Sequence, residues 1–416
     1  MRLKDITTLN PQCNIDTLST DVSFVPMESI RTGCLTPQYI DFNLGKNKYN
    51  YFAEGDLLIA KVTPCFENGN IAIAEILKEH VGFGSSELFV LRCGEKINNR
   101  FLFYLCLTVR FKNAACATMT GVAGLKRISP LFMRTYEVDL PSIADQSRIV
   151  SYLDTKTSTI DSRISVLEQK RDAYGRLKKS IINDAVTHGL NPKVKMKDSG
   201  VDWIGEIPEH WERRRLKDFA ILYGGLTGKS GDDFRCDDEE ATKPFIPFTN
   251  ILNNIRIDFC NFKRVVMSDD EIQNQVKEND LLFLMSSEDY ESIAKSSVVV
   301  GNPGEVYLNS FCRGLRIKDK EVLPEFVNYQ LQASKYRDAL RFEARGFTRI
   351  NIMGGKVASM FVSLPPCQEQ QEIVVYLDDK LSKVDYAITL LNAQIEKYKL
   401  LKRSLINEVI TGHRAV

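Results

Sequence analysis

One short stretch of the chain carries residue types that could bind a nucleotide. Gly225-Leu226-Thr227-Gly228-Lys229-Ser230 matches the end of a phosphate-binding loop, in which backbone N–H groups and a lysine surround the phosphates. The first glycine of that pattern would fall at Tyr223, and Gly231-Asp232-Asp233 continues the loop where a helix should begin. The sequence therefore favours a surface turn over an NTP-dependent enzyme, and a failure to bind nucleotide would exclude the enzyme.

The sequence carries no other catalytic pattern. It has no Asp/Asn-Pro-Pro-Tyr/Phe tetrad and no glycine-rich cofactor loop of the kind that methyltransferases use. Its four histidines and ten cysteines are not spaced as metal ligands, and no C-x-x-C pair occurs. We therefore expect a non-catalytic protein with no cofactor and no metal ion, whose cysteines are reduced structural thiols.

Polar and basic side chains gather in two glycine-containing loops. The first runs from Thr120 to Ser129, and the second follows a helix that carries Arg341 and ends at Asn351. Arginine offers a planar fork of donors that matches guanine or phosphate, and glycine lets a loop backbone come close to a duplex. We therefore predict DNA contacts here. The candidate DNA-binding residues are Lys126, Arg127, Ser129, Arg341, Arg345, Thr348, Arg349 and Asn351.

A third basic cluster, Arg213-Arg214-Arg215 with Lys217, has a different interpretation. Glu209 and Glu212 lie beside it in the sequence. Basic residues interleaved with acidic ones are typical of a solvated surface. We favour such a surface over a DNA contact for this cluster.

A long repeat must position these loops. Residues 141–187 return almost whole as residues 365–411, with about nineteen of forty-seven positions identical. Both copies have apolar residues at heptad spacing, which predicts long helices with packing seams. One such helix would fit an ordinary hairpin in a larger core, but two matched copies favour a two-fold arrangement in which they pack on each other. The seam residues are Leu153, Ile160, Leu167, Tyr174, Ile181, Leu377, Leu381, Val384, Ile388, Leu391, Ile395, Tyr398 and Leu405.

Each helix follows a domain-sized segment, and the two segments share a plan. A strand opens with Asp56-Leu57-Leu58 in the first and with Asp280-Leu281-Leu282 in the second, and the run Gly346 to Asn351 stands where Gly124 to Ser129 stood. The predicted fold is α/β of mixed α+β type, with two similar domains of short strands and helices. The predicted organisation is a domain over residues 1–140, a long helix over 141–190, a linker over 191–198, a domain over 199–365 and a long helix over 366–416.

The direction of the helices follows from chain connectivity. Only a short linker joins the end of the first helix to the second domain, which runs directly into the second helix. In a parallel pair, that domain would have to extend back along a rod of roughly 65 Å, at 1.5 Å per residue. We therefore predict an antiparallel coiled-coil pair that separates the two domains and relates them by a pseudo-two-fold axis.

Charge and hydropathy restrict the classes of function. The net charge is +1, and no apolar run approaches the roughly twenty residues of a membrane span. The N-terminus lacks the apolar core of a signal peptide. We expect a cytoplasmic protein with no membrane partner. Because bulk charge is nearly neutral, any affinity for nucleic acid must come from local clusters, from base contacts or from partner proteins.

The second domain opens with a specific sequence. The preamble from Asp198 to Trp211, together with Leu364-Pro365-Pro366, Glu369-Gln370 and the run Ile373 to Leu377, resembles the specificity subunit of type I restriction-modification systems. The resemblance covers essentially the entire chain. It implies a non-catalytic DNA-recognition subunit with two target recognition domains, each recognising one half of a bipartite, asymmetric DNA sequence. Similar proteins use the two helices as a spacer and as the docking surface for two methyltransferase subunits, and restriction (motor-nuclease) subunits join for cleavage.

A different class of function also fits the heptads and the tandem domains. The alternative is a tandem-domain coiled-coil scaffold that binds protein or carbohydrate partners. A salt-dependent, sequence-selective complex with duplex DNA in the presence of a methyltransferase partner would separate the two interpretations.

Overall fold

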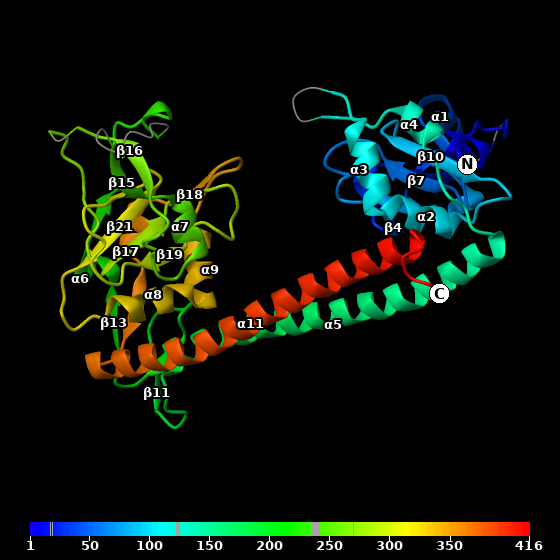
Figure 1. Ribbon diagram of the computed structural model, residues 1–416. Coiled ribbons are helices and arrows are strands. Elements are labelled where there is room, and N and C mark those ends of the chain that lie inside the picture. Colours follow the sequence, from blue (N-terminus) through cyan, green and yellow to red (C-terminus); the bar gives the residue numbers. More distant parts are fainter. Residues whose placement is uncertain (17, 19, 122–124, 235–241, 269) are drawn as a thin grey trace. The chain divides into compact units, whose positions relative to one another are not determined.

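A computed structural model describes residues 1–16, 18, 20–121, 125–234, 242–268 and 270–416. The chain forms two compact units, unit 1 (Met1–Gln169 with Leu391–Val416) and unit 2 (Lys170–Leu390). Both predicted long helices are present as α5 (Ile143–His188) and α11 (Cys367–Ile410), and each contributes residues to both units (Figure 1).

Unit 1 is built on two four-stranded sheets. One is antiparallel with the order β1-β10-β7-β8, and the other has the order β5-β2-β9-β6, with β2 and β9 parallel. Its strands are β1 (Thr7–Leu9), β2 (Asp21–Val25), β3 (Ile30–Arg31), β4 (Cys34–Leu35), β5 (Gln38–Asp41), β6 (Asn50–Ala53), β7 (Leu57–Ala60), β8 (Ile71–Ile73), β9 (Val81–Gly84) and β10 (Leu88–Cys93). Its short helices are η1 (Leu3–Asp5), α1 (Phe42–Lys48), η2 (Met27–Ser29), η3 (Lys78–His80), α2 (Asn99–Leu107), α3 (Val109–Ala117) and α4 (Pro130–Thr135).

Unit 2 repeats this plan. An antiparallel sheet has the order β14-β21-β17-β19, and a three-stranded sheet has the order β16-β15-β20, with β15 and β20 parallel. Its strands are β11 (Met196–Asp198), β12 (Glu206–Pro208), β13 (Glu212–Arg215), β14 (Ala220–Gly224), β15 (Thr242–Ile246), β16 (Lys263–Val266), β17 (Asp280–Leu284), β18 (Ser286–Ser287), β19 (Ser296–Val298), β20 (Tyr307–Leu308), β21 (Cys312–Ile317), β22 (Ile350–Asn351) and β23 (Phe361–Leu364). Its short helices are α6 (Leu216–Phe219), η4 (Asp232–Phe234), α7 (Phe248–Asn253), α8 (Pro324–Gln332), α9 (Ser334–Glu343) and α10 (Gly354–Ala358).

The local sequence explains these element boundaries. The central strands β7 and β17 are buried along their whole length, and both are nearly continuous apolar runs, as expected for strands covered on both faces. In unit 1 the side chain of Asn98 accepts hydrogen bonds from the N–H groups of Arg100 and Phe101, and the hydroxyl of Thr108 accepts one from Phe111. These side chains satisfy free backbone donors and so fix where α2 and α3 begin.

The core of unit 1 includes residues from both long helices. Val150, Leu153 and Ile160 of α5 are buried against the domain, together with Leu405 and Ile406 of α11. Because α5 contributes the part near its start and α11 the part near its end, the two helices run antiparallel within this unit.

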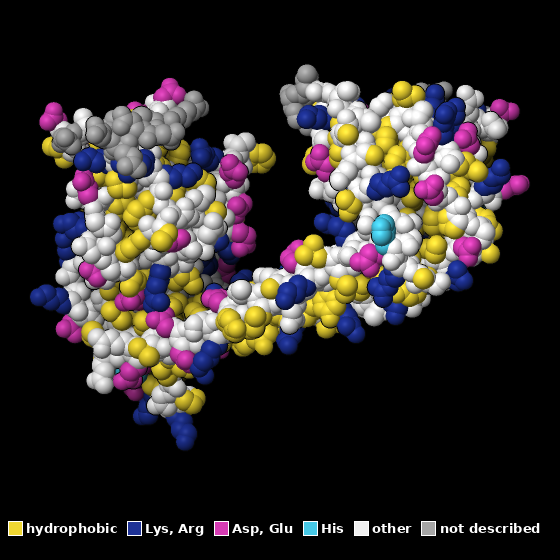
Figure 2. Space-filling model, in the orientation of Figure 1, with side chains coloured by type: hydrophobic (Ala, Val, Ile, Leu, Met, Phe, Trp, Pro, Cys, Tyr) yellow, Lys and Arg dark blue, Asp and Glu magenta, His cyan; other side chains and the backbone are white. Residues whose placement is uncertain are grey.

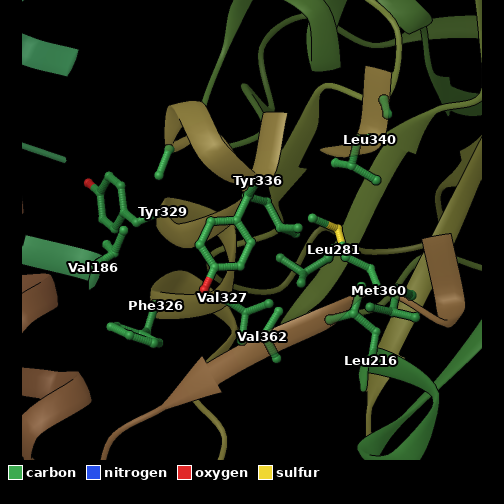
Figure 3. Packing of buried hydrophobic residues seen from close by; sticks show 14 of the residues in the cluster. Val186, Leu216, Leu281, Phe326, Val327, Tyr329, Tyr336, Leu340, Met360 and Val362 are labelled. Atoms are coloured by element: carbon green, nitrogen blue, oxygen red, sulfur yellow. The ribbon is translucent and has the colours of Figure 1, made fainter. Parts of the chain in front are cut away.

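Unit 2 has the same arrangement with the roles of the helices exchanged. Ile182 and Val186 near the end of α5, and Leu377 near the start of α11, are buried in one cluster with the domain. Figure 3 shows Tyr336 of α9 in this cluster, close to Val327, Val362 and Phe326. Its hydroxyl lies 2.9 Å from the hydroxyl of Ser363 on β23.

Two ion pairs join the helices, one in each unit. In unit 1 the Lys402 Nζ atom lies 2.7 Å from a carboxylate oxygen of Asp161, and in unit 2 the Lys178 Nζ atom lies 2.6 Å from one of Asp385. Asp161 is matched to Asp385 in the sequence repeat, and Lys178 is matched to Lys402. The antiparallel prediction is therefore confirmed in both units, and all thirteen predicted seam residues are buried or half-buried.

One buried glutamine fastens each long helix to its domain, and the two glutamines are matched in the sequence repeat. In unit 2 the Gln370 side chain donates to the carbonyls of Glu321 and Pro365, both at 2.9 Å, and accepts from the Leu323 N–H at 2.8 Å. Gln146 makes the corresponding three bonds in unit 1, to Lys96, Pro141 and Asn98. Both side chains are almost completely buried, so water could not replace these hydrogen bonds if they were lost.

Within the described residues, no helix is long and apolar enough to cross a membrane.

We expect Gln370→Ala to destabilise unit 2 by about 2 to 4 kcal/mol, because it removes three hydrogen bonds and leaves buried backbone groups without partners. Denaturant unfolding followed by tryptophan fluorescence measures the effect, since both tryptophans of the chain, Trp203 and Trp211, lie in unit 2.

The matched control is Gln368→Ala. Gln368 is exposed on the same first turn of α11 and bonds only to Glu372, so its loss should change the free energy of unfolding by less than about 0.5 kcal/mol. Equal effects of the two substitutions would show that the buried glutamine does not fasten the helix.

Candidate functional site

The second predicted DNA-binding loop is a tight hairpin in unit 2. Arg345 and Asn351 exchange backbone hydrogen bonds of 2.9 and 2.8 Å, and β22 pairs with β18. Gly346 has a φ of +139°, and a Cβ atom there would lie 2.0 Å from the Arg349 carbonyl oxygen. Only glycine fits this position, so the hairpin depends on it. Figure 1 shows the hairpin, in orange, beside β18.

The first predicted loop has the same construction in unit 1. Thr120 and Arg127 exchange backbone hydrogen bonds of 3.1 and 2.9 Å, and Arg127 also forms an isolated antiparallel β-bridge with Val62. Gly121 has a φ of +146°, and its Cβ would lie 2.2 Å from the Leu125 carbonyl oxygen. Residues 122–124 of this loop lie outside the described residues.

The structure corrects one detail of the predicted correspondence. Gly346 matches Gly121 in conformation and position, whereas the repeat predicted Gly124 as its partner. Asn351 accordingly matches Arg127, and not Ser129, at the end of the hairpin. The first loop has one more residue between its paired ends than the second. Because of this extra residue, the difference in residue number between matched positions is not the same at the two ends of the loop. A comparison that uses one constant difference therefore misaligns the loops by up to a few residues.

The three candidates in unit 1 have different surroundings. Lys126 is exposed, and its ammonium group has no partner among the described residues. The Arg127 guanidinium donates two hydrogen bonds to the Glu87 carboxylate, at 2.9 and 3.0 Å, and these raise its pKa. The Ser129 hydroxyl accepts from the Leu131 N–H and so caps α4. Of the three, Lys126 is the side chain most available to a ligand.

The candidates in unit 2 also fall into residues bound to other protein groups and residues available to a ligand. Arg341 is bound to the carboxylates of Glu291 and Asp338. The Arg345 guanidinium donates to two backbone carbonyls of its own segment, those of Phe342 and Ala344. Both side chains therefore support the structure around the hairpin.

The remaining candidates lie on the exposed part of the hairpin. Thr348 and Arg349 are exposed, and the Arg349 guanidinium lies over the Phe311 ring at 4.4 Å from its centroid. The side-chain amide of Asn351 donates to the Arg349 carbonyl. No hydrogen-bond partner of the Arg349 guanidinium is present among the described residues, so its donors are available.

Arg337, a neighbour of these candidates on α9, has a supporting role. It is buried, its guanidinium donates to the carbonyls of Glu291 and Ile293, and burial lowers its pKa to about 10. These bonds hold the segment after β18, which lies beside the hairpin, against α9. The buried Arg337 side chain is therefore not available to a ligand.

Sequence reasoning overlooked Phe347. Its side chain is 99% exposed at the tip of the hairpin, and Phe342 beside the hairpin is 75% exposed. The one available signal was that Phe347 lies among glycine, threonine and arginine. Such a segment has no apolar periodicity that would predict a buried helix or strand face.

The phosphate-loop-like stretch is a surface turn, as predicted. The Lys229 ammonium is bound to the Glu271 carboxylate at 2.5 Å, and the Ser230 hydroxyl and N–H bond to Asp233. A single 3-10 turn follows in place of a helix. Among the described residues, no group of three or more His, Cys, Asp or Glu side chains could hold a metal ion.

A groove of about 860 Å³ runs along the helix pair in unit 1. It is lined by Val166 and Leu167 of α5 and by Tyr398 and Leu401 of α11, together with polar neighbours. Val166 and Leu401 are 62% and 51% exposed. Figure 2 shows hydrophobic side chains, in yellow, along the surface of the two long helices. This surface is more apolar than a solvated helix face requires.

Comparison with known proteins gives concordant results. The chain is 34% identical over 152 residues to the type I restriction enzyme EcoEI specificity subunit of Escherichia coli, covering 36% of this chain and 26% of that protein. It is 29% identical over 215 residues to the EcoAI specificity subunit of the same species, covering 51% and 34%. The matches thus span only about a quarter to a third of the length of these two relatives.

Fold comparison extends over the whole chain. A solved structure that concerns complex assembly and conformational transition of the type I R-M system matches with a TM-score of 0.74 and 17% identity, covering 99% of this chain and 96% of that one. The family model described as the type I restriction modification DNA specificity domain matches residues 1–169 and 208–398. The chain, with its two matched domains and its antiparallel helix pair, therefore belongs to the type I restriction-modification DNA specificity family.

Proposed function

We propose that this chain is the non-catalytic DNA-specificity subunit of a type I restriction-modification complex. Each of its two domains recognises one half of a bipartite, asymmetric DNA sequence. The observation that carries this proposal is a pair of hairpins that are closed in the same way, each next to a glycine. One presents Lys126, and the other presents Thr348 and Arg349. One scaffold with two different surfaces suits a target whose halves differ.

The local charges support DNA as the ligand. The second hairpin carries two arginines and no acidic residue between Ala344 and Asn351, and Arg349 is the one whose donors are available. A guanidinium at the end of a short loop can bond bidentately to guanine in the major groove or to phosphate. Because the net charge of the chain is only +1, partner subunits supply much of the phosphate neutralisation.

The helix pair is the proposed docking surface for two methyltransferase subunits. The groove bounded by Val166 and Leu401 exposes apolar side chains that a protein partner could cover. The sequence repeat gives the helix pair two matched surfaces, which fits two copies of one partner. Restriction subunits join this assembly for cleavage.

A scaffold for protein or carbohydrate partners is the rival proposal, and family membership does not support it. Binding of duplex DNA by the chain with its methyltransferase subunits distinguishes the two. We expect sequence-selective binding that weakens steeply with salt. Binding that is equal for all sequences, or absent, would favour the scaffold.

Arg349→Ala tests the candidate base contact. If Arg349 bonds bidentately to a base, the variant complex should lose discrimination by about 1 to 3 kcal/mol at one position of the half-site recognised by the second domain. Competition binding with single-base variants of the target measures this loss. Arg349→Lys keeps the charge without the planar fork, so it should restore affinity but not discrimination.

The matched control is Lys217→Ala, which removes one exposed positive charge from the same domain away from the hairpin. It should leave discrimination unchanged. If Arg349→Ala weakens binding equally on every sequence, Arg349 contacts phosphate and not a base.

Exchange of the first domain tests modularity. Replacing residues 5–138 with those of another family member should change one half of the recognised sequence and leave the other half intact, because each domain has its own core and its own hairpin. Selection of bound duplexes from a randomised pool gives both halves. A change in both halves would contradict the assignment of one half-site to each domain.

Shortening the helix pair tests its role as a spacer. Removing one heptad from each helix, Gln169 to Gly175 and Ala393 to Lys399, preserves the seam and removes about 10 Å of helix, or roughly three base pairs. We expect both half-sequences to be retained with a shorter gap, at reduced affinity because one half-site also rotates about the duplex. Removing the heptad from one helix only is the control, and it should abolish binding. An active doubly shortened variant with an unchanged gap would exclude the helices as the spacer.

A further inference from the structure

Phe347 occupies an unusual position for a phenylalanine. It is 99% exposed at the tip of the unit 2 hairpin. Full exposure of an aromatic ring of this size forgoes the stabilisation that its burial would contribute. Aromatic side chains are enriched at contact surfaces relative to the rest of a protein surface.

The hairpin holds Phe347 in a defined place. Its two ends are closed by the bonds between Arg345 and Asn351, and Asn351 is paired to Ser286 of β18. The Tyr290 hydroxyl donates to the Gly346 carbonyl at 3.4 Å. These contacts order the loop before any ligand arrives, so binding needs little further loss of conformational entropy.

The chemistry around Phe347 indicates what it contacts. Its neighbours in the loop are Gly346, Thr348 and Arg349, and no acidic side chain lies between Ala344 and Asn351. An apolar protein surface would not require flanking cations, whereas a duplex presents phosphates outside and stacked aromatic bases inside. An exposed apolar ring, followed along the chain by a hydroxyl and a guanidinium, combines a group that can stack on bases with groups that can bind phosphate or base edges.

We propose that Phe347 inserts between neighbouring base pairs of the duplex bound by the second domain, with Thr348 and Arg349 on the flanking backbone or base edges. The inference rests on the proposed function and adds a second source of specificity to it. Because unstacking costs less at flexible pyrimidine–purine steps, the inserted ring makes this domain sensitive to a base step that it does not hydrogen-bond.

The experiment uses the full-length chain in complex with its methyltransferase subunits. Target duplexes carry 2-aminopurine at each position of the second half-site in turn, since the fluorescence of this base rises when it is unstacked. We expect a rise at one base step. Phe347→Ala should remove that rise and weaken binding roughly ten- to a hundredfold, and Phe347→Trp should retain both properties.

The control is Ile76→Ala, which removes an apolar side chain that is 92% exposed in unit 1. It should leave fluorescence and affinity unchanged. Sequence-selective binding without a fluorescence rise at any position, or a rise that persists in Phe347→Ala, overturns the insertion and leaves the proposed function in place. Absence of sequence-selective binding by the wild-type complex overturns both.

Discussion

Neither domain of this protein completes its core without both long helices. The apolar side chains that α5 buries in unit 1 come from near its start, and those that it buries in unit 2 come from near its end; α11 does the reverse. Burial of this surface is the dominant favourable term in the stability of each unit. The antiparallel pairing, the matched ion pairs and the matched buried glutamines all follow from two copies of one segment meeting the same requirement twice.

This constraint separates the parts that the two units share from the parts in which they differ. Each unit has a four-stranded antiparallel sheet, the helix α2 or α8 beside it, and the glutamine bonds, and a change there would open a core. Both hairpins are closed by a pair of backbone hydrogen bonds next to a glycine, and the described side chains of Lys126, Thr348 and Arg349 are exposed. These exposed side chains can therefore change at little cost in stability, which suits the proposed recognition of a two-part DNA sequence.

The framework could be predicted from the sequence, whereas the details of the site could not. The repeat and its heptads predicted both long helices and their seam, since periodicity is a property of the sequence alone, and the short linker predicted their direction. The pairing of Arg127 with Glu87, and of Arg341 with Glu291, joins residues distant in sequence, so the supporting role of these arginines was hidden. The one-residue difference in loop length hid the match between Gly121 and Gly346. Phe347 was overlooked because exposure is decided by the fold and not by residue type.

We propose that this chain alone determines the DNA sequence on which its complex acts. Mapping of methylated bases in the DNA of cells that produce the methyltransferase subunits, with and without this chain, tests it most directly. We expect one methylated sequence that depends on the chain and consists of two different half-sequences separated by a gap of fixed length. Methylation that is the same without the chain, or that falls on one continuous sequence, would contradict it.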